Sequence, residues 1–502
     1  MILRIAAFAV SILFPATGWA GDMVTLTTLD EWRIIEGELV SFEAGYYRIK
    51  TDAGALTLDS GDVTCSGTAC PTSDALITRT KFAGPAEMIH RLVPMLLERF
   101  AEDNGLKYNH IFVSDDRAIW ELSVPELDQI VAVIEGEVVA DRAAHEMLRS
   151  RDVTLAFGRF DGGRGVDADV IALDALVPVV ALDNPLTEIT QAQFRDVLAG
   201  RIRNWSDLNG VNDPVHVMLA EARFMDSDLA RVFPKTRIRR VERDADIEGL
   251  AARISDDPTT FGVVPLSMMG NTMPLVIRGG CGLASPATDA TVKSEDYPLT
   301  QPLFLFRNAA HQPRIVRDFV AFVRSPEAQP AIRAAGFVDQ GIGRVPFERQ
   351  GHRLANAVLA ANDDRARLSE VQRMVVELMQ GHRLTLTFRF EDGASTLDVQ
   401  SRSNVRRLAD AIRRGEFEGE ELVFVGFTDG EGPEDGNLRL SKRRANSVRK
   451  EVLNFLGGAD IDLIAEGFGE IVPMACDDTD WGRQVNRRVE VWVREPSATH
   501  LR

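Results

Sequence analysis

The sequence predicts a multidomain protein with a small N-terminal β module, a central α/β domain and a C-terminal α+β sandwich. Its 502 residues exceed what one hydrophobic core usually organises. Short strand-like runs separated by turn residues fill residues 23 to 63, and beyond them short apolar runs alternate with amphipathic helical patterns. With 45% hydrophobic and 26% charged residues, the composition is that of a globular chain with several buried cores.

The first 20 residues have the pattern of a secretory signal peptide. Arg4 precedes an apolar run from residue 5 to residue 15, and the small residues Gly18 and Ala20 end the segment. This run is too short to span a bilayer, and no later stretch reaches about 18 uninterrupted apolar residues. We therefore expect an exported, soluble protein of the periplasm without a transmembrane segment. Any association with the outer membrane would have to be peripheral.

Charge and motif content exclude several classes of function. The formal net charge of -18 would repel phosphate-rich polymers, so we expect no nucleic-acid partner. The chain has no Gly-x-Ser-x-Gly elbow, His-Glu-x-x-His helix or Gly-Lys-Ser/Thr phosphate loop, so we expect no enzyme and no cofactor. The eight histidines do not cluster with the cysteines at ligand spacing, and no metal site is expected.

Four cysteines bear on the covalent structure. Cys65 and Cys70 flank a Ser-Gly-Thr-Ala turn, a spacing that favours a short-loop disulfide in an oxidising compartment. Cys281 and Cys476 are far apart in sequence, and either an interdomain bridge or two buried thiols would account for them.

Hydrophobic patterning divides the rest of the chain. The β module is expected to cover residues 21–75, and the α/β domain residues 77–346, with an amphipathic helix from residue 86 to 100 as one example of its helices. A charged, Ala-rich stretch at residues 350–381 has helical periodicity and is interpreted as a helical linker. Residues 382–495 are expected to fold as the α+β sandwich.

The C-terminal segment shows strand and helix patterns in the order β-α-β-α-β. Alternating runs predict strands at residues 384–390, 421–427 and 489–493, and amphipathic periodicity predicts helices at residues 401–414 and 440–455. In this arrangement Asp429 lies in the loop after the second strand, and Arg444 lies about one turn into the second helix.

Asp429 and Arg444 could therefore face a common pocket. One Asp and one bidentate Arg suit the ammonium and the carboxylate of an amino-acid head group. A partly exposed salt bridge without functional meaning is the alternative, and the chemistry of the two residues does not decide between them.

Four motifs between residues 382 and 494 resemble the OmpA-like family. They occur in the family's order and spacing. The motifs are Gly426-Phe427-Thr428-Asp429-Gly430-Glu431-Gly432, Asn437-Leu438-Arg439-Leu440-Ser441, Arg444-Ala445-Asn446-Ser447-Val448 and Gly482-Arg483-Gln484-Val485-Asn486-Arg487-Arg488-Val489-Glu490.

This resemblance implies binding of peptidoglycan. In the family, the residues that match Asp429 and Arg444 bind the diaminopimelate of the stem peptide. The resemblance further implies that Thr428, Asn437 and Arg487 shape the pocket. Phe427 stands where the family often has His, which alters the rim of the pocket and leaves the charged pair in place.

The central segment resembles phosphate-type periplasmic binding proteins over most of residues 80 to 345. The resemblance implies a bilobal α/β fold that holds an anion between its lobes. The matching segments are 81–105, Ala172 to Val180 as the interlobe crossing strand, Asn184 to Thr190, Val197 to Leu208, Tyr297-Pro298-Leu299 and Ser325-Pro326-Glu327-Ala328-Gln329.

Three segments that hold the anion in that family depart from its pattern. The hydroxyl-rich turns are replaced by Phe82-Ala83-Gly84-Pro85, Ala156-Phe157-Gly158-Arg159 and Glu221 to Ser227. Pro85 also removes a backbone N–H donor. Arg159 and Arg223 remain as candidates for binding a small anion or a carboxylate by charge. A retained scaffold whose cleft is empty or binds a protein partner is the alternative.

These features give two hypotheses for the function. The first is a non-catalytic protein of the periplasm that is anchored to the cell wall through its OmpA-like domain and presents a degenerate substrate-binding domain. The second is a receptor that delivers phosphate or another anion to an ABC-type importer, which needs a closing cleft with anion donors. The altered anion segments and the wall anchor favour the first hypothesis.

Overall fold

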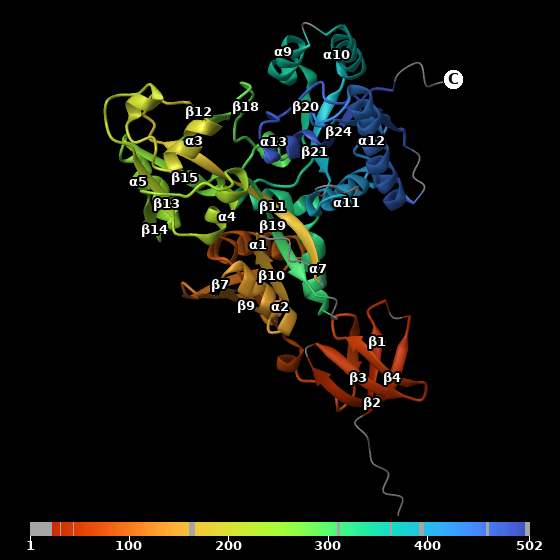
Figure 1. Cartoon of the computed structure of the whole chain (residues 1–502). Coiled ribbons are helices and arrows are strands. Elements are labelled where there is room, and N and C mark those ends of the chain that lie inside the picture. The colour runs from red at the N-terminus through yellow and green to blue at the C-terminus, as the bar shows by residue number, and fades with distance from the viewer. Residues whose placement is uncertain are drawn as a thin grey trace, which may run out of the picture.

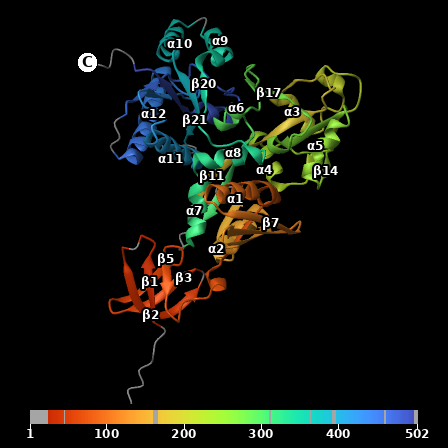
Figure 2. The same ribbon diagram turned by 180° about the vertical axis from the view of Figure 1, so that it is seen from behind.

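The computed structural model describes residues 23–496, apart from residues 31, 44, 160–165, 309–311, 362–363, 391–395 and 458–460. The predicted signal peptide, residues 1–20, lies outside the described residues. The predicted multidomain architecture is confirmed, with a small β sheet at one end, a bilobal α/β domain in the middle and an α+β domain at the other end (Figures 1 and 2). No helix within the described ranges combines the length and apolar character needed to cross a membrane.

The N-terminal module is an antiparallel sheet in the order β4-β3-β2-β1-β5. Inward-facing Val24, Leu26 and Ile49 form its core. The Cys65–Cys70 disulfide closes the module as expected, with 5.8 Å between the two Cα atoms. Its strands are β1 (Met23–Thr28), β2 (Ile34–Glu43), β3 (Tyr46–Thr51), β4 (Gly54–Asp59) and β5 (Val63–Ser66).

The module contacts one helix of the central domain, α7 (Arg314–Val323). Arg317 donates to the Asp59 carboxylate at 2.8 Å, and Arg314 donates to the Gly61 carbonyl at 2.5 Å. Both arginines are about two-fifths exposed, whereas Asp59 is buried at 4% exposure, so the Arg317–Asp59 pair is the more shielded of these contacts.

The first lobe contains a parallel arrangement of β10, β6 and β9 that continues into an antiparallel β9-β8-β7 meander. The meander replaces the strand and helix alternation expected for this segment, because Ala118, Trp120 and Leu122 alternate with outward-facing residues along β8. The elements are β6 (Thr78–Gly84), α1 (Val93–Asp103) after a π-helical turn (Met88–Leu92), β7 (Lys107–Ser114), β8 (Arg117–Val124), β9 (Gln129–Val138), α2 (Asp141–Ser150), β10 (Leu155–Gly158), α7 and α8 (Gln329–Ala334).

Two long antiparallel strands, β11 (Asp167–Val180) and β19 (Thr300–Arg307), connect the first lobe to the second. The predicted crossing strand from Ala172 to Val180 lies in β11. The second lobe contains β12 (Glu188–Thr190), α3 (Gln191–Leu198), β13 (His216–Ala220), α4 (Arg223–Val232), β14 (Glu242–Asp244), α5 (Ile247–Ser255), β15 (Thr260–Pro265), β16 (Met273–Pro274), β17 (Val276–Arg278), β18 (Ala284–Ser285) and α6 (Asp289–Lys293).

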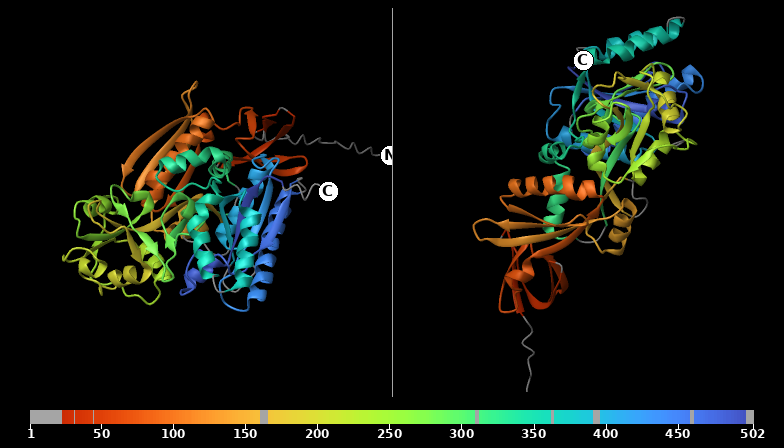
Figure 3. Two further views of the ribbon diagram at one scale, coloured as in Figure 1. Left: turned by 90° about the horizontal axis from the view of Figure 1, so that it is seen from above. Right: turned by 90° about the vertical axis from the view of Figure 1, so that its left-hand side faces the viewer.

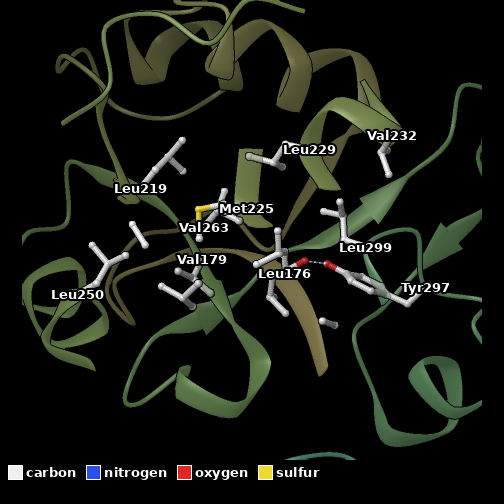
Figure 4. Packing of buried hydrophobic residues seen from close by; sticks show 14 of the residues in the cluster. Leu176, Val179, Leu219, Met225, Leu229, Val232, Leu250, Val263, Tyr297 and Leu299 are labelled. Carbon is white, nitrogen blue, oxygen red and sulfur yellow. Dashed lines mark hydrogen bonds between the residues drawn. The ribbon is translucent and has the colours of Figure 1, made fainter. Parts of the chain in front are cut away.

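The second lobe packs its helices on β11, β13 and β15 around one hydrophobic core. Leu229 of α4 and Leu250 of α5 point toward Val179 of β11 from different sides (Figure 4). The Tyr297 hydroxyl donates to the Leu176 carbonyl at 3.0 Å, so this buried phenol has a hydrogen-bond partner (Figure 4). Leu176 lies where β11 changes its pairing from β19 to β15.

The C-terminal domain is a sheet in the order β20-β21-β24-β22-β23, covered by helices. Within the predicted segment 382–495, its element order contains one strand, β23, and one helix, α13, that the predicted β-α-β-α-β pattern lacks, and α12 begins six residues earlier than expected. The elements are β20 (Arg344–Pro346), α9 (Gly351–Ala360), α10 (Arg365–Leu378), β21 (His382–Arg389), α11 (Val399–Arg413), β22 (Glu421–Gly426), α12 (Glu434–Leu456), β23 (Leu463–Gly467), α13 (Asp480–Asn486) and β24 (Arg488–Arg494).

The segment predicted as a helical linker belongs to this domain. Met374 and Leu378 of α10 pack against Val423 and Trp492 on one face of the sheet, while α11 and α12 cover the other face. In addition, β20 lies in the stretch assigned by sequence to the central domain, yet Val345 pairs with Arg383 at the edge of this sheet. The interpretation as a linker is therefore wrong, because the apolar face of α10 is buried rather than exposed.

The C-terminal domain is joined to the bilobal domain by a covalent bond and a buried ion-pair cluster. Cys281, between β17 and β18, forms a disulfide with Cys476, which settles the open question of these two cysteines as an interdomain bridge. Arg383 of β21 donates to Asp296 at 2.8 Å. Arg389, also of β21, donates to the Ser294 and Glu295 carbonyls. Figure 3 shows the C-terminal domain (blue) beside the central domain in two further orientations.

Candidate functional site

Two glycines bring helix α12 close to the sheet and so position the candidate loop. A Cβ atom at Gly426 would lie 2.0 Å from the Ser441 carbonyl oxygen, and one at Gly467 would lie 2.4 Å from the Lys442 nitrogen. Only glycine allows such an approach without a shift of the backbone. The loop between β22 and α12 is therefore held against the second turn of the helix.

Asp429 is the third residue after β22 and is 8% exposed. Its Oδ2 accepts a hydrogen bond from Arg487 Nη1 at 2.9 Å, so Arg487 is the ion-pair partner of this carboxylate. The next residue, Gly430, donates its backbone N–H to Asp477 at 2.8 Å. These contacts fix the loop between the start of β24 and the segment before α13.

Arg444 lies about three turns into α12, since the helix begins at Glu434 rather than at residue 440 as expected. Its guanidinium carbon is 5.4 Å from the centre of the Phe390 ring. Burial and the nearby Arg487 lower the pKa of Arg444, while Asp429 opposes them, so the three charged groups are close in space. Of the two cations, Arg487 is the one with a direct ion pair to Asp429.

The remaining predicted residues have different environments. Thr428 is 2% exposed, and its Oγ1 has no hydrogen-bond partner within the described part of the chain. The same holds for Nη1 of Arg444. The Asn437 amide donates to the carbonyls of Asp429 and Glu431, at 3.3 and 3.1 Å, which ties the loop to the first turn of α12. Asn437 thus positions the loop rather than offering its amide to a ligand.

A buried cation cluster that the sequence analysis missed supports this loop from behind. The guanidinium carbon of Arg488 lies 4.2 Å from the centre of the Phe427 ring, and that of Arg353 lies 5.3 Å from it. Both arginines bind Glu490, at 2.7 Å for Arg488 and 2.6 Å for Arg353. Arg488 and Glu490 are 0% exposed, so the Phe427 ring packs on a fully buried ion pair.

Arg159, which follows β10 directly, is compensated by the protein's own acidic groups. Its side chain is 5% exposed, forms an ion pair with Glu87 and lies 3.7 Å from Asp174. The Phe224 ring stacks on it, with 4.2 Å between the guanidinium carbon and the ring centre. Burial raises the pKa of Asp174, and burial also raises the pKa of Asp228, whose charge acts on Arg159. Three carboxyl groups, those of Glu87, Asp174 and Asp228, thus surround the single cation of Arg159.

Arg223, which was expected beside Arg159, is not part of this cluster. It is the first residue of α4 and is exposed, whereas its neighbour Phe224 is the residue that contacts Arg159. Successive helical residues point about 100° apart, so the ring of Phe224 takes the inward position. The structure does not pair the two arginines around a common anion.

Comparison with known proteins assigns two parts of the chain. Residues 389–487 match the model of the OmpA family, and residues 143–327 match the model of a PBP superfamily domain. Outer membrane porin F of Pseudomonas fluorescens is 38% identical over 111 residues, which cover 22% of this chain and 33% of that protein. The chain thus spans about a third of the length of this relative.

The central part has more distant relatives. The phosphate-binding protein PstS of Borreliella burgdorferi is 19% identical over 201 residues, covering 38% of this chain and 71% of that protein. The crystal structure of an ABC-type phosphate transport receptor from Vibrio cholerae is 15% identical with a TM-score of 0.39, covering 52% of this chain and 99% of the receptor. The chain therefore combines a PBP superfamily domain at residues 143–327 with an OmpA-family domain at residues 389–487.

Proposed function

We propose that this chain is a non-catalytic protein of the cell envelope that binds the diaminopimelate stem peptide of peptidoglycan. Asp429 receives the ligand's ammonium group, and Arg444 receives the carboxylate on the same carbon. Thr428 and Arg487 line the pocket, and Asn437 holds its loop in place.

One observation carries this proposal. Asp429, Arg444 and Arg487 are brought together from three separate segments, and two polar atoms beside them, Thr428 Oγ1 and Arg444 Nη1, have no hydrogen-bond partner among the described residues. Buried donors without acceptors are costly in a folded protein, at about 1–3 kcal/mol each. A carboxylate that accepts from Arg444 removes that cost, and an ammonium group at Asp429 completes a zwitterion.

We further propose that the bilobal domain is a fixed scaffold in the periplasm rather than a receptor that closes on phosphate. Arg159 already has Glu87 and Asp174 as partners, so an incoming phosphate would meet excess negative charge. The Cys281–Cys476 bond also ties the second lobe to the C-terminal domain, which restrains the hinge motion that solute capture requires. Both observations weigh against the alternative of an anion receptor for an ABC-type importer.

Titration with a soluble diaminopimelate-containing muropeptide tests the binding site directly. We expect Asp429→Ala and Arg444→Ala each to weaken binding roughly tenfold or more, because each removes one charge-assisted hydrogen-bond partner. Arg443→Gln is the matched control, since Arg443 is exposed on the same helix turn and its loss should leave the affinity unchanged. Equal affinities for all four proteins would disprove the assignment.

A further inference from the structure

A cavity of about 910 Å³ lies at the junction of the bilobal and C-terminal domains. One wall comes from the segment between β17 and β18 together with α6. The opposite wall comes from β20, the 3-10 turn Phe347–Gln350, α9 and β21. Cavities of this size at domain junctions are typical binding sites for small organic molecules.

The walls of this junction cavity are strongly cationic, although the chain as a whole is acidic. Its lining contains the single carboxylate of Asp296 and five guanidinium groups. The five are Arg278, Arg344, Arg349, Arg353 and Arg383. Two of these rim arginines are neutralised from outside the cavity, Arg278 by Glu188 and Arg344 by Glu420 at 2.6 Å.

The deep wall keeps an excess of positive charge. Four buried arginines share three carboxylates behind this wall, so one cation is in excess. The arginines are Arg353, Arg383, Arg389 and Arg488, and the carboxylates are Glu490, Asp296 and Glu295. Burial and the two neighbouring arginines lower the pKa of Arg488 to about 9, whereas Glu490 opposes them. Burial is the largest cause of this lowering, and repulsion by Arg353 and Arg383 adds to it.

Hydrogen-bond donors without acceptors mark the same wall. The side chains of Arg353 and Arg383 are 9% and 6% exposed. Within the described ranges, the Nε atom of neither residue has a hydrogen-bond partner. At the rim, Arg349 is exposed and forms no ion pair with any described residue. The cavity thus offers one guanidinium without an ion-pair partner among the described residues, that of Arg349, beside Arg353 and Arg383, which already pair with Glu490 and Asp296.

The rest of the lining mixes polar side chains, such as Thr288, Gln350 and Asn356, with an apolar group. Val345, Pro346 and Leu384 come from the C-terminal sheet, and Met474 comes from the segment before Cys476. We propose that the junction cavity binds a small organic oxyanion, with its charged group at Arg349 and the deep arginines and its apolar body against these side chains. This site is separate from the Asp429 loop and does not depend on the proposed wall binding.

Anilinonaphthalene sulfonate is a suitable probe, because it joins an oxyanion to an apolar body and fluoresces when bound. Titration of the full mature protein should show one saturable site. Arg349→Gln should weaken it about tenfold, the cost of one charge-assisted hydrogen bond. Ala284→Trp, which projects a large ring from β18 into the cavity, should abolish it. The neutral analogue N-phenylnaphthylamine should bind at least about tenfold more weakly than the sulfonate.

Arg237→Gln is the matched control, since Arg237 is also exposed and forms no ion pair within the described chain, but lies in the second lobe away from the cavity. Far-UV circular dichroism and retention of the Cys281–Cys476 bond confirm the fold of each variant. Displacement of the dye by soluble muropeptide would identify the bound oxyanion as a cell-wall component, and displacement only by phosphate esters would identify it as a free solute. The proposal is overturned if the wild type shows no saturable site, if both cavity variants bind like the control, or if the neutral analogue binds equally well.

Discussion

Replacing Asp296 by Ala should be among the most damaging single changes at the interface between the two large domains. Asp296 is 3% exposed and lies in the segment between α6 and β19. Arg383 donates to it at 2.8 Å and Arg389 at 3.4 Å, and both arginines come from β21 of the C-terminal domain. Although burial opposes its ionisation, these two guanidinium groups hold the pKa of Asp296 below its usual value.

The expected loss is about 3–5 kcal/mol in the free energy of unfolding, because Asp296→Ala leaves buried guanidinium charge without its partner. Asp296→Asn keeps the shape and removes only the charge, so it should fall between the wild type and Asp296→Ala. Asp318→Ala is the matched control. Its carboxylate pairs with Arg314 at 3.4 Å but is half-exposed, and its loss should cost less than about 1 kcal/mol.

Urea unfolding followed by tryptophan fluorescence measures these differences, and limited proteolysis shows whether the two domains separate first. Trp492 lies in the C-terminal domain and Trp120 in the first lobe, so unfolding of the two domains is detected together. An Asp296→Ala protein as stable as Asp318→Ala would refute the view that this buried ion pair holds the domains together.

Three further predictions concern the covalent bond, acid stability and the cleft. Replacing Cys281 and Cys476 by Ser should lower the free energy of unfolding by at most about 5 kcal/mol, the chain-entropy value for a bond between residues 195 apart. Thermal unfolding of the variant and the wild type without reductant measures this loss, and an unchanged stability would contradict the interdomain bond. Although burial opposes ionisation, three arginines hold the pKa of Glu490 well below 4.5, so its stabilising contribution is present above the unfolded pKa and lost as the pH falls through the folded pKa. Urea unfolding at a series of pH values should show a smaller loss of stability in acid for Glu490→Gln than for the wild type, and equal pH profiles would contradict this role of Glu490. Calorimetric titration with inorganic phosphate should show no saturable binding at millimolar concentration, because Arg159 is already paired with Glu87, and micromolar affinity would contradict the scaffold role.

Features that depend on local patterns were predictable from the sequence. The Cys65–Cys70 bond follows from a short loop between the two cysteines. The loop after β22 follows from a buried strand that ends at Gly426. The predicted start of α12 at residue 440 is six residues too late, because Glu434 and Asp435 supply the acidic first turn that marks its true beginning.

Features that depend on tertiary contacts were not predictable. The pairing of Val345 with Arg383 joins a three-residue strand to a distant sheet edge, and such a short strand has no periodicity of its own. The amphipathic pattern of α10 is the same for a linker helix and for a helix packed on a sheet. Likewise, the spacing of Cys281 and Cys476 carries no information about their distance in the fold.

The partners of the predicted arginines also required the structure. The sequence analysis assigned Arg159 to an anion, but Glu87 and Asp174 approach it from other segments. Arg487 was expected to shape the pocket, and in the structure it is the direct ion-pair partner of Asp429 at 2.9 Å. Charge neutralisation by residues distant in sequence is common to both arginines.

Sedimentation of the mature protein with purified diaminopimelate-type peptidoglycan, at two salt concentrations, tests the central claim most directly. The wild type and Arg443→Gln should sediment with the wall, and the Asp429→Ala, Arg444→Ala double variant should remain in the supernatant. A double variant that sediments as fully as the wild type, or a wild type that stays in solution, would contradict wall binding through this loop.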